Sequence, residues 1–136
     1  MEKKAKTPDT ENMNFFSYQL STFKYAGRGV RMFFTYESKA FIHLAAAIVA
    51  VFLGFLFGIS MVEWALISIA IGAVYAAELI NTAIERFADI IHPDIHQKIA
   101  DIKDMSAGAV LIVSITALVI GLVVFVPRIV AIFLSA

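Results

Sequence analysis

The chain has 136 residues, of which 60% are hydrophobic and only 16% are charged. A water-soluble domain of this length needs a larger polar surface, so the composition predicts an integral membrane protein. The formal net charge is zero, which gives no indication of nucleic-acid binding, and the absence of cysteine excludes disulfides and thiolate chemistry.

The N-terminal region is too polar to cross a membrane. We expect residues 1–12 to form a polar cytoplasmic tail. Residues from about 14 to 36 alternate aromatic side chains with cations, and this pattern predicts a helix that lies in the cytoplasmic interface of the membrane. A basic anchor with no further role is an equally good interpretation of the same composition.

Three apolar runs follow, each long enough to cross a bilayer as a helix of roughly 20 residues. We expect spans at about 39–60, 62–91 and 103–127, with Pro127 ending the third, so residues 13–136 form one all-α membrane domain. Lysine and arginine concentrate before the first span and between the second and third. By the positive-inside rule the N-terminus is cytoplasmic and the C-terminus lies outside.

The second span carries the polar residues with the clearest chemical content. Glu78, Asn81, Glu85 and Asp89 recur at helical spacing and therefore share one face. Ionisable groups at membrane depth are costly and usually line a site. The deeper carboxylate could take a proton from a lipid hydroxyl, and the one nearer the cytoplasm could hold a divalent ion. The alternative is a polar seam that joins helices. In either case we expect neighbouring subunits to enclose this face, since exposure to hydrocarbon is unfavourable.

Other polar residues are less informative alone. Lys103 and Asp104, at the start of the third span, could contact phosphate oxygens and nucleotide hydroxyls, but a lysine at the membrane boundary and a capping aspartate are common. His43 suggests an interfacial or packing role, and His96 suggests a solvated loop histidine. The sequence contains no Walker-type phosphate loop, so any nucleotide is held in another way.

Residues 78–89 resemble the E-[IL]-[LI]-N-[ST]-A-I-E-x-x-x-D signature of the bacterial membrane-integral diacylglycerol kinase family, which includes the undecaprenol kinases. Glu37 and His43 match the E-x5-H pattern that begins the family's first span. Residues 23–26 are similar to its surface-helix motif, and residues 96–111 match its H-x6-K-D run. The arginine that many members carry two residues before the histidine is Phe41 here.

The resemblance implies a homotrimer that uses ATP and Mg²⁺ to phosphorylate a lipid alcohol in the bacterial cytoplasmic membrane, feeding phospholipid or lipid-carrier metabolism. Matching positions imply that Glu78 is the catalytic base, that Asn81 positions it, and that Glu37 and Glu85 bind the metal ion and, through it, ATP. The remaining implied nucleotide contacts are Tyr25, Asp94, His96, Lys103 and Asp104.

Two other classes of function suit a small membrane bundle. An ion- or proton-conducting subunit would carry ionisable groups across the bilayer, whereas residues 105–126 contain none. A non-catalytic scaffold would not need Glu37, Glu85 and Lys103 to converge at one end. We therefore expect a lipid kinase. Diacylglycerol and undecaprenol both remain possible substrates, because a hydrophobic pocket distinguishes apolar chains only weakly.

Overall fold

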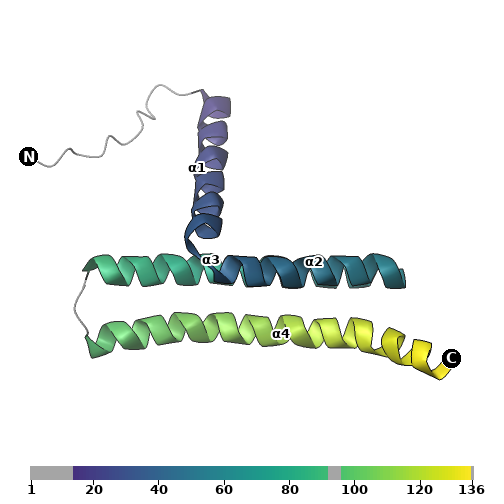
Figure 1. Ribbon diagram of the computed structural model, residues 1–136. Helices are drawn as coiled ribbons and strands as arrows, with labels where there is room; N and C mark the ends of the chain where they lie inside the picture. The colour runs from purple at the N-terminus through teal and green to yellow at the C-terminus, as the bar shows by residue number, and fades with distance from the viewer. Residues whose placement is uncertain (1–13, 92–95, 136) are drawn as a thin grey trace, which may run out of the picture. The chain divides into compact units, whose positions relative to one another are not determined.

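The computed structural model describes residues 14–91 and 96–135, which form four α-helices (Figure 1). These are α1 (Phe15–Tyr36), α2 (Lys39–Phe57), α3 (Met61–Ile91) and α4 (Gln97–Ser135). The helices α2, α3 and α4 are each long and apolar enough to cross a membrane. The prediction of an all-helical protein with three membrane spans is therefore confirmed, while the expected polar tail lies outside the described residues.

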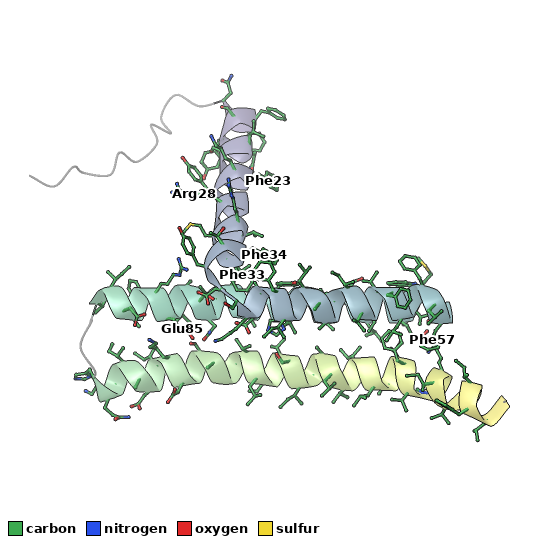
Figure 2. The ribbon with its side chains drawn as sticks, in the orientation of Figure 1. Phe23, Arg28, Phe33, Phe34, Phe57 and Glu85 are labelled. Carbon is green, nitrogen blue, oxygen red and sulfur yellow. The ribbon has the colours of Figure 1, made fainter. Side chains whose placement is uncertain are left out.

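Helix α1 is a compact unit distinct from the unit that begins at Glu37. Several of its hydroxyl side chains bond to its own backbone carbonyls one turn earlier, which satisfies them without outside partners. Its aromatic residues, including Phe23, which Figure 2 labels, are largely exposed. The hydroxyl side chains that bond in this way are Ser17, Ser21, Thr22 and Thr35. Attachment of α1 to the membrane surface remains a prediction.

The connection between α2 and α3 is a tight turn that reverses the chain. Gly58 ends α2 in the left-handed conformation, with φ 57° and ψ 50°, which residues with a side chain rarely adopt. Ser60 and Glu63 then form a capping box at the start of α3. The Ser60 backbone N–H donates to Glu63 Oε2 at 2.8 Å, and the Glu63 backbone N–H donates to Ser60 Oγ at 3.3 Å.

The main apolar cluster lies beside this turn. Ile59, Ile67, Val124 and Phe125 are buried together, and the indole of Trp64 packs against them. The indole fits because residue 54 is a glycine: a Cβ there would lie 2.7 Å from Trp64 Cη2. Figure 2 shows Phe57, which also packs on this cluster, at the opposite end of the three-helix unit from Glu85. The apolar core and the polar face of α3 therefore occupy different ends of the unit.

Helix α4 continues through Pro127 to Ser135, so the expectation that Pro127 ends the helix is wrong, while the end of the membrane span itself remains a prediction. Proline has no backbone N–H, so the Val123 carbonyl, four residues before Pro127, loses its usual helical donor. Arg128 Nη1 donates to the Val124 carbonyl at 2.6 Å. The same guanidinium pairs with both carboxylate oxygens of Glu63, each at 2.8 Å. Arg128 thus adds a side-chain hydrogen bond to the turn that contains the proline and connects α4 to α3.

Helix α4 also begins at Gln97, about six residues before the expected start of the span. His96 Nδ1 accepts a hydrogen bond from the Lys98 backbone N–H at 3.2 Å, which caps the first turn. Gln97 Nε2 donates to Asp101 Oδ1 at 2.9 Å, one turn apart on the helix surface. These polar contacts extend the helix beyond the apolar run from which its start was predicted.

Candidate functional site

Three polar side chains of α3 are buried within a single chain. Glu78, Asn81 and Thr82 are 4%, 3% and 8% exposed. The expectation that neighbouring subunits must enclose this face is therefore wrong for Glu78 and Asn81, because side chains of α2 and α4 already contact them. Burial of these groups consequently gives no support for any particular number of subunits.

Glu78 forms its contact with α2. Its Oε1 lies 2.9 Å from Nε2 of His43, a residue 35 positions earlier in the chain. The carboxylate side chain is only 5% exposed and the imidazole 24% exposed. The ring of Tyr75, one turn before Glu78 on α3, meets the imidazole edge to face, with centroids 6.5 Å apart. The deepest carboxylate of the polar face is thus held by a second ionisable side chain.

Asn81 connects α4 to Glu85. Ser106 Oγ donates to Asn81 Oδ1 at 2.6 Å, and Asn81 Nδ2 donates to Glu85 Oε1 at 2.9 Å. A carboxylate can only accept hydrogen bonds, so the amide nitrogen must face Glu85 and the amide oxygen must face Ser106. Figure 2 shows Glu85 on the side of α3 that faces α4. The amide is therefore oriented from both ends.

Two ion pairs continue the polar face toward the end of α3. Lys103 Nζ lies 2.9 Å from Asp89 Oδ1, and Arg86 Nη2 lies 3.5 Å from Glu37 Oε1. The Asp89 side chain is 65% exposed and that of Lys103 is 35% exposed. Ion pairs with this much exposure contribute roughly 0–1 kcal/mol, so a phosphate or a metal ion can displace one partner at little cost.

The two predicted metal ligands come from different parts of the chain, Glu85 from α3 and Glu37 from the segment before α2. Glu37 reaches Arg86, the residue after Glu85. Carboxylate oxygens are the donors that Mg²⁺ prefers, so the chemistry of this pair fits the ion. Within the described parts of the chain, no three histidine, aspartate or glutamate side chains gather into a metal-binding group. The assignment of both carboxylates to a metal remains a prediction.

The other predicted site residues are more scattered. Tyr25 is exposed on α1, the separately described unit, and Asp104 is exposed on α4. The ring of His96 caps α4 through Nδ1. Asp94 lies outside the described residues. The sequence did not assign a partner to Glu78 or to the amide of Asn81. Ser106 lies in the run 96–111 that matches the family, but the sequence did not indicate which residue of α3 it would contact.

An apolar groove of about 460 Å³ begins beside the polar face. His43 and Tyr75 line it at this end, and it extends between α2, α3 and α4 to Phe125 and Ile129. Small residues of α2 and α4 give the groove its depth, because their side chains leave space between the helices. These are Ala46, Ala47, Ala50, Ala117 and Gly121.

Comparison with known proteins gives a consistent family. A family model described as prokaryotic diacylglycerol kinase matches residues 24–125, a range that includes α2, α3 and the α4 residues Lys103 and Ser106. The chain is 37% identical over 107 residues to a Bacillus subtilis protein named undecaprenol kinase, covering 79% of this chain and 87% of that protein. It is 30% identical over 103 residues to a Synechocystis protein named diacylglycerol kinase, covering 75% of this chain and 59% of that protein. The chain therefore belongs to the prokaryotic diacylglycerol kinase family.

Proposed function

We propose that this lipid kinase transfers the γ-phosphate of ATP to the hydroxyl of a membrane lipid, with Glu78 as the general base. The observation that carries this proposal is the position of Glu78. It is a buried carboxylate whose hydrogen-bond partner, His43, lines an apolar groove. Glu78 is one hydrogen bond away from the groove, so a lipid whose hydrocarbon chain lies along the helices would bring its hydroxyl close to this base.

In this reaction the lipid hydroxyl gives its proton to Glu78 while its oxygen bonds to the γ-phosphorus. The bond between that phosphorus and the bridging oxygen breaks, and ADP leaves. Lys103 binds phosphate oxygens after releasing Asp89, and Asn81 orients Glu85 through its amide nitrogen. Glu37 and Glu85 would hold Mg²⁺, which when bound neutralises charge on the phosphates.

The lipid is a long-chain alcohol. The relative with 87% of its length covered is named undecaprenol kinase, and the relative with 59% covered is named diacylglycerol kinase. We infer undecaprenol as the first candidate, because the relative named for it has the higher identity to this chain and is covered over more of its length. Both alcohols should be offered in mixed micelles, and a preference for diacylglycerol would overturn this choice.

We further propose a homotrimer in the bacterial cytoplasmic membrane, with the N-terminus and the α3–α4 connection in the cytoplasm. Lys98 and Lys103 near that connection support the orientation, and Arg128 lies at the other end of α4. Large apolar side chains on α2 and α4, such as Phe55 and Val123, are exposed and suit lipid or subunit contacts. The number three comes from the family resemblance. Native mass spectrometry from micelles should detect three chains.

The test of the mechanism is Glu78→Gln, assayed by transfer of labelled phosphate to lipid. We expect the rate to fall by roughly 10²- to 10⁴-fold, the usual contribution of a general base, with ATP binding retained. Asp101→Asn is the control, because it removes a negative charge from an exposed position on α4, where Asp101 accepts a hydrogen bond from Gln97. Near-normal turnover in Glu78→Gln would remove this residue from the mechanism.

A further inference from the structure

Glu78 has a hydrogen-bond partner, His43, to which the proposed reaction assigns no role. His43 approaches from α2, and its Nε2 lies 2.9 Å from one oxygen of the buried carboxylate. We propose that His43 is a positioning residue that donates a hydrogen bond to Glu78 Oε1 and thereby directs Oε2 to the substrate hydroxyl. This inference rests on the proposed role of Glu78 as general base.

The direction of the hydrogen bond follows from the chemistry of the base. Before the reaction Glu78 must be a carboxylate, and a carboxylate has no hydrogen to donate. The hydrogen between the two side chains must therefore be carried by His43 Nε2. A bond that engages Oε1 stops rotation of the carboxylate group, and Oε2 becomes the oxygen that receives the proton from the lipid.

The imidazole is itself held in place. The ring of Tyr75 contacts it at an interplanar angle of 71°, and Tyr75 and Glu78 lie one turn apart on the same side of α3. The same two rings line the polar end of the apolar groove. His43 therefore lies between the carboxylate that it orients and the space that we assign to the lipid chain.

A purely structural role would also account for a hydrogen bond to a buried carboxylate, and it makes different predictions. If His43 only satisfied a buried charge, its loss would lower thermal stability and would affect ATP and lipid kinetics together. A residue that positions the base changes kcat while the KM for ATP stays constant. Its effect also disappears once the base itself has been removed.

The variants His43→Gln and His43→Asn separate these cases, because both carry an amide and differ in where it lies. The glutamine Nε2 can occupy the position of the imidazole Nε2, whereas the asparagine amide is shorter and reaches only the position of Nδ1. We expect His43→Asn and His43→Leu to lower kcat on the order of 10- to 100-fold through misplacement of the base. His43→Gln should restore most of the rate.

The measurement is lipid phosphorylation in mixed micelles with the full chain, together with the KM for ATP and the thermal unfolding temperature of each variant. In a Glu78→Gln background, His43→Leu should cause no further loss. Equal rates for His43→Gln and His43→Asn would overturn the inference. A further loss of rate when His43→Leu is added to Glu78→Gln would also overturn it. An inactive Glu78→Gln beside a fully active His43→Leu rejects the inference alone. An active Glu78→Gln rejects the proposed function itself.

Discussion

Replacement of Ser106 by alanine tests whether α4 controls the polar face of α3. The substitution removes the hydroxyl that donates to Asn81 Oδ1 at 2.6 Å. Asn81 is only 3% exposed, so its amide oxygen would lose this donor with little access to water. The amide is then free to rotate, and its nitrogen is no longer directed at Glu85.

The magnitude follows from the burial of the amide. An unsatisfied buried acceptor costs about 1–3 kcal/mol, and about 1.4 kcal/mol corresponds to a tenfold change in rate. Because Glu85 would become less ordered, we expect part of this cost to appear in metal binding. Ser106→Ala should therefore lower kcat roughly tenfold. It should also raise the Mg²⁺ concentration that gives half of the maximal rate, measured with Mg²⁺ varied at a constant ATP concentration.

Lipid phosphorylation is measured against Mg²⁺ concentration at saturating ATP and lipid. Thr116→Val is the control, since it removes another α4 hydroxyl, one that bonds only to the Ile112 carbonyl within the helix. Ser106→Thr retains the donor and should recover activity. If Ser106→Ala has the same rate and the same Mg²⁺ requirement as the wild type, the contact with Asn81 does not organise the site.

Three further variants test other parts of the molecule. Lys103→Met should raise the KM for ATP and leave that for lipid unchanged, because the ammonium is assigned to phosphate oxygens; an effect on lipid alone would make it a membrane anchor. Glu37→Ala and Glu85→Ala should each increase the Mg²⁺ requirement, and an unchanged requirement in both would exclude them as ligands. Gly54→Ala should lower the free energy of unfolding by about 1–3 kcal/mol, because its Cβ would lie 2.7 Å from a carbon of the Trp64 indole. Gly72→Ala is the control, since its Cβ would meet open space, and it should not lower the unfolding temperature.

The helices were predictable because their signals are local. Apolar runs of sufficient length require helices in a membrane, and Gly58 with Ser60 provides a turn between two of them. The end of α4 was not predictable from Pro127 alone. Just after the proline, Arg128 bonds both to the Val124 carbonyl and to Glu63, which lies 65 residues earlier. A contact at that separation depends on how α3 and α4 pack.

The candidate site shows the same division between local and distant information. Asn81 and Glu85 lie four residues apart on one helix, so the sequence indicated that they share a face, but it did not indicate the hydrogen bond between them. The partners of this face were not indicated. His43 and Ser106 come from α2 and α4, 35 and 25 residues from the groups that they contact, and their positions depend on helix register.

The polar face of α3 also changes in solvent exposure along its length, and this gradient suits the proposed reaction. The Glu78 side chain is 5% exposed, Glu85 is half-buried and the Asp89 side chain is 65% exposed. Proton transfer from an alcohol benefits from a site that excludes water, whereas ATP arrives from water and must exchange with it. The buried end also borders the apolar groove through His43. One helix can therefore present its base to a substrate from the bilayer and its outer carboxylates to a substrate from solution, without any large movement of the chain.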